Sequence, residues 1–462
     1  MYHVRGKANQ AMEYLTLKIR ICKILTVGLI TQILQGHNFI GKRATKRPCR
    51  RCNQMKLNVR RAWITIPGLA LCLGLGAVAC ASEPAPVPAA EPQVVMMEEP
   101  KVDVDTLKVE VVAHYAAGVH GLYSQSLASA RVMDTAIDAF IADPNPASLE
   151  AAKRAWLRAR DDYGPTEVFR FYGGPIDNEE NGPEGLINAW PMDESYIDYV
   201  EGNPTAGIIN MPDEYPTIDA ELIISLNEEG GEANVSTGWH AIEFLLWGQD
   251  LNDGGPGDRP VEDFTTNDNA DRRAQYLAVA SDTLIGHLQD MVDAWAPGGG
   301  NYRAEFLAKL VDEALVDIIT GAGALSKGEL AGERMFVAYS ERSQEDEHSC
   351  FSDNTVADIV GNAIGVRMVL TGDYGVVVGP GIIDLFAADN EALADRLTSE
   401  TALAVTIARN IPDPFDQHLT DTAPDSAFGR SQVLSTIEAL ERQADTIVEG
   451  AAAFGFTINT SV

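Results

Sequence analysis

Apolar residues recur every three or four positions along one unbroken stretch of this 462-residue chain, from Val102 to Ile141. That spacing places the side chains on a single face of an α-helix about ten turns long. So long an amphipathic helix has to bury its apolar face against other helices or a sheet, which constrains the whole fold. The repeat includes Leu107, Val111, Tyr115, Val119, Leu122, Leu127 and Val132.

The same spacing predicts further helices over 146–163, 270–295, 303–325, 329–344, 354–371, 389–409 and 428–453. Runs typical of strands are few and short, such as Val376 to Val378. We therefore predict an all-α fold of two helical-bundle domains, covering residues 101–260 and 261–462 and joined near 250–270. Residues 164–235 are rich in Gly, Pro and Asn. This composition predicts a long irregular segment between helices, which we call the excursion. Long ordered loops of this kind usually have a function.

The basic residues at the front of the chain indicate export. Residues 1–79 hold 14 of the 35 Lys and Arg residues but only one of the 67 acidic residues. From Met55, a short basic region precedes an apolar core and the small residues Ala77 to Ala79, which is the pattern of a signal peptide. Because Cys80 follows directly, the pattern is similar to a lipoprotein signal in which Cys80 is lipidated. Ala77 stands where leucine is commoner, so plain cleavage after Ala79 stays open.

These observations divide the front of the chain into three segments. Residues 1–54 have no place ahead of a signal peptide, and we interpret them as an upstream extension from a misassigned start. Residues 55–79 form the signal, and 80–100 a Pro- and Ala-rich tether. The net charge of −32 excludes a nucleic-acid partner, since such a surface repels phosphate.

The segment GWHAIEFLLWGQD carries two candidate metal ligands in an apolar setting. On a helix, His240 and Glu243 share one face, and Ser236 or Thr237 is placed to cap that helix. The positive helix end favours a neutral imidazole, and an imidazole with a carboxylate is a good donor set for iron or zinc. An ordinary packing or capping pair is the alternative. The HExxH signature of zinc peptidases is absent from the sequence.

A second polar concentration is SQEDEHSCFSDNT. Glu345 and His348 have the three-residue spacing that helical di-iron proteins use, with Asp346 between them. We take these three residues as candidate site neighbours, against the alternative of a solvated helix end. Cys350 is expected to be a buried hydrophobe, with a ligand or reactive thiol as the alternative.

The chain resembles the imelysin family, in its iron-regulated protein A branch. The resemblance is carried by GWHAIEFLLWGQD, which matches a GxHxxE motif, by AAKRAWLRARDDYGPTEVFRFYGGPID, by GPEGLINAWPMDESYIDYVEG and by GERMFVAYSERSQEDEHSCFSDNT. It implies a two-domain helical fold, and it implies an exported, often lipid-anchored protein of iron acquisition. It also implies that His240 and Glu243 ligate metal, with Glu167 as a third candidate, and that Trp156 and Arg160 are site neighbours.

We therefore expect a metal-binding protein of the cell envelope, in the outer membrane or facing the periplasm. The expected cofactor is iron, with zinc as the alternative. The expected partners are a metal ion or metal chelate, the membrane through a lipid anchor only, and an envelope iron-transport protein. Two other functions stay open: a metal-dependent peptidase in which Glu243 ligates metal or activates water, and an interaction lipoprotein that holds no metal.

Overall fold

The computed structural model describes residues 103–462 except 253 and 421. The predicted extension, signal peptide, tether and lipidated Cys80 lie outside the described residues. The helices are α2 (Val104–Ala142), α3 (Pro146–Tyr163), α4 (Glu184–Asn188), α5 (Ala220–Leu226), α6 (Gly238–Trp247), α7 (Ala270–Trp295), α8 (Tyr302–Ala308), α9 (Val311–Ala324), α10 (Ala338–Glu341), α11 (Thr355–Thr371), α12 (Ile382–Asp389), α13 (Glu391–Ala408) and α14 (Phe428–Ala453).

The all-α prediction is confirmed, because residues 103–462 apart from 253 and 421 contain no strand and only two isolated bridges. Short 3₁₀ turns join the helices: η1 (Gly164–Phe169), η2 (Glu194–Tyr196), η3 (Ile208–Asn210), η4 (Val261–Phe264), η6 (Gln344–Asp346) and η7 (Asp416–His418). The segment η5 (Leu325–Val337) is a π-helix. The periodic stretch that opens the fold forms α2, whose apolar face is buried along its whole length.

Two predicted helices differ from the structure. The helix expected over 303–325 ends at Ala308 as α8, and the one expected to begin at 329 is part of a continuous rod. In that rod α9, η5 and α10 follow one another from Val311 to Glu341. Two glycines of this rod allow close packing. A Cβ atom at Gly321 would lie 2.7 Å from the carbonyl oxygen of Val168, and one at Gly328 would lie 2.8 Å from that of Thr460.

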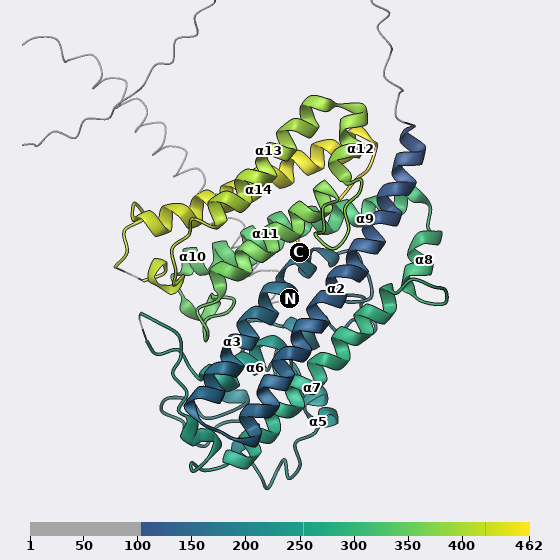
Figure 1. Ribbon diagram of the computed structural model, residues 1–462. Helices are drawn as coiled ribbons and strands as arrows, with labels where there is room; N and C mark the ends of the chain where they lie inside the picture. The colour runs from purple at the N-terminus through teal and green to yellow at the C-terminus, as the bar shows by residue number, and fades with distance from the viewer. Residues whose placement is uncertain (1–102, 253, 421) are drawn as a thin grey trace, which may run out of the picture. The chain divides into compact units, whose positions relative to one another are not determined.

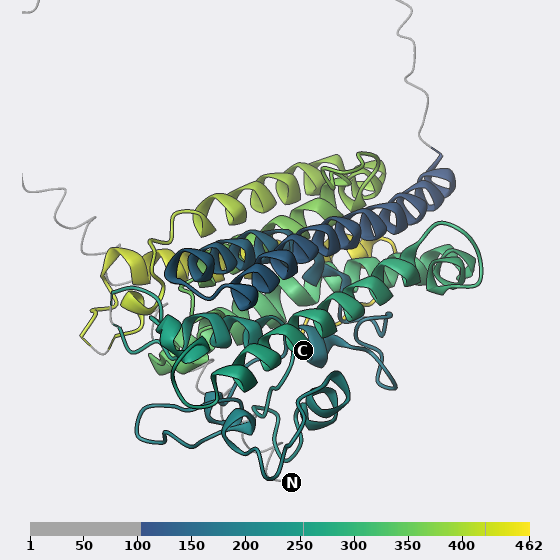
Figure 2. The ribbon, with the colours of Figure 1, turned by 60° about the horizontal axis from the view of Figure 1, so that its bottom comes forward.

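The helices pack in two groups that share α2 and η1 (Figures 1 and 2). In one group α2 lies against α3 and α7, and α6 lies against α3, α4 and α7. In the other, α13 and α14 pack on each other, α14 packs on η5, and α13 packs on α11. The helix α11 in turn lies against η1, directly after α3. The division into two domains at 250–270 stays a prediction, while α7, beyond that boundary, packs on α2.

The excursion over 164–235 is held to the helices by buried ion pairs. Asp198 contacts Arg273 of α7 at 2.6 Å and Arg259 at 2.8 Å, and Arg259 also contacts Asp263 at 3.0 Å. All four side chains are almost fully buried. A buried charge without a partner is costly, so these contacts fix the path of the excursion.

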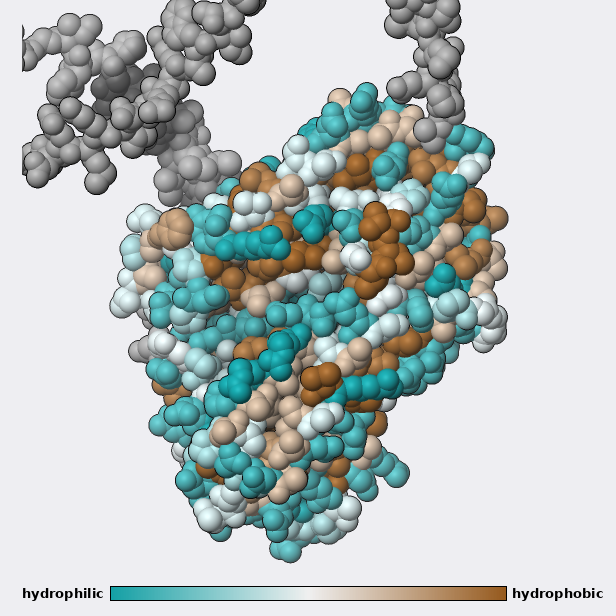
Figure 3. All heavy atoms as spheres, viewed as in Figure 1, coloured by the Kyte–Doolittle hydropathy of each residue, from teal (hydrophilic) through white to brown (hydrophobic). Residues whose placement is uncertain are grey.

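The exposed surface carries both hydrophilic and hydrophobic residues. Figure 3 shows hydrophilic residues over much of one face, with hydrophobic residues gathered in separate patches. Of the helices in the described part of the chain, none combines the length and apolar character needed to cross a membrane.

Candidate functional site

The helix α6 begins in close contact with the backbone of α4. Gly238 has a φ of 84°, and a Cβ atom there would lie 2.4 Å from the carbonyl oxygen of Ile187. The first glycine of the motif is therefore required both by its conformation and by the lack of space. Ser236 and Thr237, which we expected to cap α6, instead donate their hydroxyls to backbone carbonyls of α5 and α4. They fasten the start of α6 to its neighbours.

His240 and Glu243 contact each other one turn apart on α6. Nδ1 of His240 is 2.9 Å from Oε2 of Glu243, and both side chains are fully buried. Oε1 of Glu243 accepts hydrogen bonds from the backbone N–H of Ser352 at 2.9 Å and from its hydroxyl at 2.6 Å. Burial raises the pKa of Glu243 to about 8, against the opposing effect of the Ser352 hydrogen bonds. Both carboxyl oxygens are thus engaged, and one of them orients the His240 ring.

His348 is held in the same manner by Asp358, in the first turn of α11. Nδ1 of His348 is 2.8 Å from Oδ2 of Asp358. The Asp358 carboxylate also accepts from the Ser349 hydroxyl at 2.6 Å and from the Asn354 amide at 3.2 Å. Each of the two histidines therefore has a carboxyl group at Nδ1, from α6 in one case and from α11 in the other.

The two imidazole rings lie against each other with centroids 4.8 Å apart, in an edge-to-face arrangement. Nε2 of each ring is buried and has no hydrogen-bond partner among the described residues. Burial lowers the pKa of both rings well below the usual value, and the nearby Arg160 guanidinium lowers it further. Both rings are therefore neutral at neutral pH, the state in which imidazole holds a metal. Trp190 packs against His240, with the two ring centroids 4.9 Å apart.

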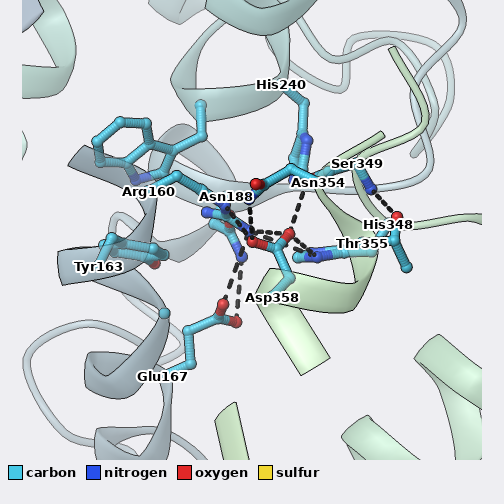
Figure 4. Close-up of polar contacts among 12 residues, drawn as sticks. Arg160, Tyr163, Glu167, Asn188, His240, His348, Ser349, Asn354, Thr355 and Asp358 are labelled. Atoms are coloured by element: carbon cyan, nitrogen blue, oxygen red, sulfur yellow. Dashed lines mark hydrogen bonds and ion pairs between the residues drawn. The ribbon is translucent and has the colours of Figure 1, made fainter. Parts of the chain in front are cut away.

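The buried guanidinium of Arg160, from α3, lies between Asp358 and Glu167 (Figure 4). Its Nε and Nη2 donate to the two oxygens of Asp358, both at 3.1 Å. Nη1 donates to Oδ1 of Asn188 at 2.5 Å, and Nη2 is 3.7 Å from Oε1 of Glu167. The bidentate carboxylate partner of Arg160 is thus Asp358, the residue that orients His348.

Glu167 in η1 is fully buried among nitrogen donors. Its carboxylate accepts from Arg334, from Asn188 at 3.2 Å and from Asn362 at 3.2 Å. Burial alone would raise the pKa of Glu167, but Arg334 and Arg160 outweigh it and hold the pKa at about 2. Arginine donors occupy this carboxylate and would repel a cation, so Glu167 does not fit a metal ligand in this arrangement.

The other predicted neighbours occupy different places. Trp156 donates Nε1–H to the backbone oxygen of Trp239 at 3.1 Å, which joins α3 to α6. Glu345 is exposed and Asp346 half-buried in η6, and the chain leaves that turn in an extended conformation. The expected helical spacing of Glu345 and His348 therefore does not form, and only His348 reaches the site. Cys350 is buried, and burial raises its pKa well above the usual value.

Several residues of the site were not predicted: Asn188, Arg334, Ser352, Asp358 and Asn362. Asp358 carried a usable signal, since it is the one acidic residue in the mostly apolar helix α11. Asn362 lies one helical turn after Asp358 on α11, so it shares that signal. Asn188 at the end of α4, Arg334 in the π-helix η5 and Ser352 in a turn have no signal in spacing, because they reach the site from separate elements.

The donor atoms that fit a metal ion are the two Nε2 atoms. They are buried, unpartnered and neutral, and each has a carboxyl group at Nδ1, as ligating histidines commonly do. Across residues 103–462, leaving aside 253 and 421, no three His, Cys, Asp or Glu side chains are grouped so as to hold a metal ion. The described side chains therefore supply two imidazole donors for a metal ion and no third donor.

Comparison with known proteins agrees with the resemblance seen in the sequence. The family model described as Imelysin (Peptidase_M75) matches residues 119–447. The iron-regulated protein A of Synechococcus elongatus is 24% identical over 335 residues, which is 70% of this chain and 80% of that protein.

Two crystal structures share the fold. One, described as an iron-regulated protein A precursor from Parabacteroides distasonis, has a TM-score of 0.60 at 18% identity and covers 78% of this chain and 97% of its own. An imelysin-like protein from Psychrobacter arcticum has a TM-score of 0.54 at 14% identity, with 78% and 98% covered.

Proposed function

Because this chain belongs to the imelysin family, we propose that it binds iron and serves in iron acquisition, with Nε2 of His240 and His348 as its donor atoms. The observation that carries this proposal is the pair of neutral, buried imidazoles whose Nε2 atoms lack partners. An unpartnered buried nitrogen is costly, and a ligand that accepts its lone pair removes that cost. Water or a chelating molecule would complete the coordination, in keeping with a metal ion or metal chelate as the ligand.

The two carboxyl groups have a role different from the one that we predicted for Glu243. A carboxyl oxygen that accepts the Nδ1 proton fixes the tautomer in which Nε2 carries a lone pair. In this proposal Glu243 orients His240 and Asp358 orients His348, while Arg160 holds Asp358. The motif predicted an imidazole and a carboxylate, from His240 and Glu243, as the metal donors. The proposal replaces them with two imidazoles, from His240 and His348.

The geometry of the histidine pair does not identify the metal or the place of the protein in the cell. The proposal takes iron from the names of the relatives and the location from the signal-peptide pattern. Imidazole suits iron and zinc alike, so the donors do not decide between them. The names of the relatives favour iron, since two of them are called iron-regulated protein A. The signal-peptide pattern before Cys80 supports an exported protein with a lipid anchor, in the outer membrane or facing the periplasm. An envelope iron-transport protein is the partner that this role requires.

Metal titration of the purified chain tests the proposal. We expect calorimetry with iron and zinc to show that His240→Ala and His348→Ala each weaken binding more than about 100-fold, beyond the usual effect of losing an orienting partner. Glu243→Gln is the sharper variant. Its amide would donate to Nδ1, which leaves the proton on Nε2 and blocks ligation while the Ser352 hydrogen bonds survive.

Glu345→Gln, an exposed change nearby, serves as the matched control and should bind as the unaltered chain does. If both histidine variants are folded and bind metal as tightly as this control, the site holds no metal.

A metal-dependent peptidase has less support. Both oxygens of Glu243 are engaged by protein donors and the ring of His240. Efficient cleavage of a peptide library that is sensitive to chelators and lost in Glu243→Gln would reverse this order.

A further inference from the structure

The two imidazole Nε2 atoms are closed off from solvent in this arrangement. His240 is fully buried, His348 is 3% exposed, and Nε2 of each ring is buried. His240 lies on α6, which packs on α3, α4 and α7, so it moves only if these helices are disturbed. His348 lies instead on an irregular segment between α10 and α11. A ligand of the pair therefore enters through a movement, and the segment that carries His348 is the part best placed to make it.

We call this segment, Arg342–Asp353, the strap. It joins the end of α10 to the start of α11, and the short turn η6 is the helical part that it contains. The backbone lies in the left-handed region at both of its ends, with a φ of 56° at Arg342 and of 60° at Asp353. Neither residue is glycine. Non-glycine residues in this conformation are strained, and they occur often at ligand clamps and switch regions.

The strap is tied to distant parts of the chain mainly through side chains. Within the described part of the chain, one backbone hydrogen bond joins it to a segment far away in sequence, from the N–H of Gly257 to the carbonyl oxygen of Phe351 at 2.9 Å. At the other end of the strap, the side-chain amide of Gln344 donates to Asp250. The strap can therefore leave its place without breaking a ladder of backbone hydrogen bonds.

The strap also closes the histidine pair. It supplies His348 itself and, from Ser352, the two hydrogen bonds to Glu243 on α6. Phe351 is 1% exposed and packs on Trp190, with ring centroids 5.8 Å apart. Displacement of the strap would take one imidazole away from the other and would remove the side chains that cover them.

We propose that the strap is a gate, which opens locally about Arg342 and Asp353 and admits a metal ion or a metal chelate to the two Nε2 atoms. The contacts that break belong to turns and side chains, so α6 and α11 keep their packing while the strap moves. The opening does not depend on the proposed function, whereas closure on a metal ion rests on it. A metal bound by both rings would join the strap to α6 and hold the gate closed.

The thiol of Cys350, on the strap, is a native probe of this movement. It is 5% exposed, so iodoacetamide reaches it only when the strap opens. The full chain is labelled in native buffer, and mass spectrometry of the peptide that contains Cys350 separates it from the other cysteines. We expect a labelling rate that low concentrations of urea hardly change, because local opening exposes little surface. A rate that rises with urea as steeply as the global unfolding constant would overturn the proposal.

Two variants loosen the strap. Ser352→Ala removes the hydroxyl bond to Glu243, and Gln344→Ala removes the bond to Asp250. Each should speed the labelling of Cys350 about 3- to 10-fold, the effect of one lost hydrogen bond. Unchanged labelling in both would show that these contacts do not hold a gate, and would contradict the proposal.

Ser340→Ala is the matched control. The hydroxyl of Ser340 is exposed on α10, just before the strap, and it donates to the carbonyl oxygen of Val337 in the preceding turn. Its loss leaves every contact of the strap in place, so Cys350 should react as in the unaltered chain. Faster labelling in this control would show that the reaction follows general loosening and not the strap.

Zn²⁺, which does not oxidise a thiol, tests closure. At about 10 times its Kd, it should slow the labelling of Cys350 about 10-fold in the unaltered chain and leave the rate in His240→Ala unchanged. Labelling at full speed with Zn²⁺ bound, or equal slowing in His240→Ala, would overturn the gate. If the chain binds neither Zn²⁺ nor iron, the proposed function fails, while labelling that is independent of urea would still establish the opening.

Discussion

At the scale of single residues, the buried carboxyl of Glu243 lowers the free energy of unfolding at high pH. Its folded pKa of about 8 lies above the ordinary value of 4.5. The folded state therefore binds the proton more tightly, and stability falls as pH rises from about 4.5 through 8. The shift corresponds to a loss on the order of 5 kcal/mol across that window. We expect Glu243→Gln to remove this slope and to raise the free energy of unfolding at pH 8.

Urea denaturation of metal-free protein at pH 5 and pH 8 measures this effect. Glu345→Gln, in which the substituted residue is exposed, should keep the slope of the unaltered chain. An equal pH dependence in Glu243→Gln and the unaltered chain would show that the carboxyl is ionised in the folded state.

The residues of the site also show what a sequence can and cannot predict. His240 was predicted from one helical turn, because three-residue spacing on a helix fixes which side chains are neighbours. Asp358 comes from α11, and it meets Arg160 across 198 positions of chain. Such a contact depends on how helices pack, which the periodicity of either helix leaves open. Glu167 shows the same limit, since its arginine partner lies in a π-helix that no local pattern predicts.

At the scale of secondary-structure elements, Glu167 connects three elements, η1, η5 and α11. It lies in η1 and contacts Arg334 of η5 and Asn362 of α11. Its pKa of about 2 lies below the ordinary 4.5, so its contribution to stability is present above pH 4.5 and is lost as pH falls through 2. The shift corresponds to about 3 kcal/mol. Glu167→Gln leaves buried arginines uncompensated and should cost roughly 3–5 kcal/mol at neutral pH.

Chemical denaturation of Glu167→Gln at pH 7 and pH 3 checks this prediction. The difference from the unaltered chain should shrink at the lower pH, where protonation begins to remove the same charge. A constant difference would mean that the loss comes from shape and not from charge.

The contact between α11 and η1 depends on a glycine. A Cβ atom at Gly365 would lie 2.4 Å from the carbonyl oxygen of Pro165, which is backbone and cannot rotate away. We expect Gly365→Ala to push α11 from η1 and to cost about 1–3 kcal/mol, despite the better helix propensity of alanine. If the histidine pair binds metal as proposed, this change should also weaken that binding, because Asp358, which orients His348, lies on α11.

Gly286 on α7 offers the matched control, since a Cβ atom there meets nothing within 4 Å. Gly286→Ala should stabilise the protein by about 0.5–1 kcal/mol through helix propensity alone. Thermal unfolding of both variants gives the comparison. Equal stabilisation in the two would show that α11 has room to move.

At the scale of the whole molecule, the bounds of several long helices followed from periodicity, since 146–163, 270–295 and 428–453 coincide with α3, α7 and α14. Helix partners did not follow, because apolar faces of similar width are interchangeable in sequence. The helix α7 is the clearest case. It begins beyond the predicted boundary at 250–270, but it packs on α2 and α6 and is tied to the excursion by the ion pair of Arg273 and Asp198.

This packing predicts how the molecule unfolds. A fragment of residues 261–462 would contain α7 without α2 and α6, and so would expose its buried face, including Tyr276, Leu277 and Leu284. It would also leave Arg273 without Asp198. Because α2 in addition contacts α8, α9 and α12, both halves lose surface that they need to fold. We expect the fragment to lack fixed tertiary structure and the described part of the full chain to unfold in one transition.

Near-ultraviolet circular dichroism of the fragment, and calorimetry of the full chain, test this prediction. A fragment of residues 101–260 should fail in the same way, since α2 would lose α7. Two separate transitions, each reproduced by one fragment alone, would instead establish two autonomous bundles. In that case α7 would have to find other partners inside its own half, and the contact between α2 and α7 would be a docking surface. One transition places the histidine pair inside a single cooperative unit, because His240 and His348 come from opposite sides of the predicted boundary. Metal bound at that pair would then stabilise all of it together.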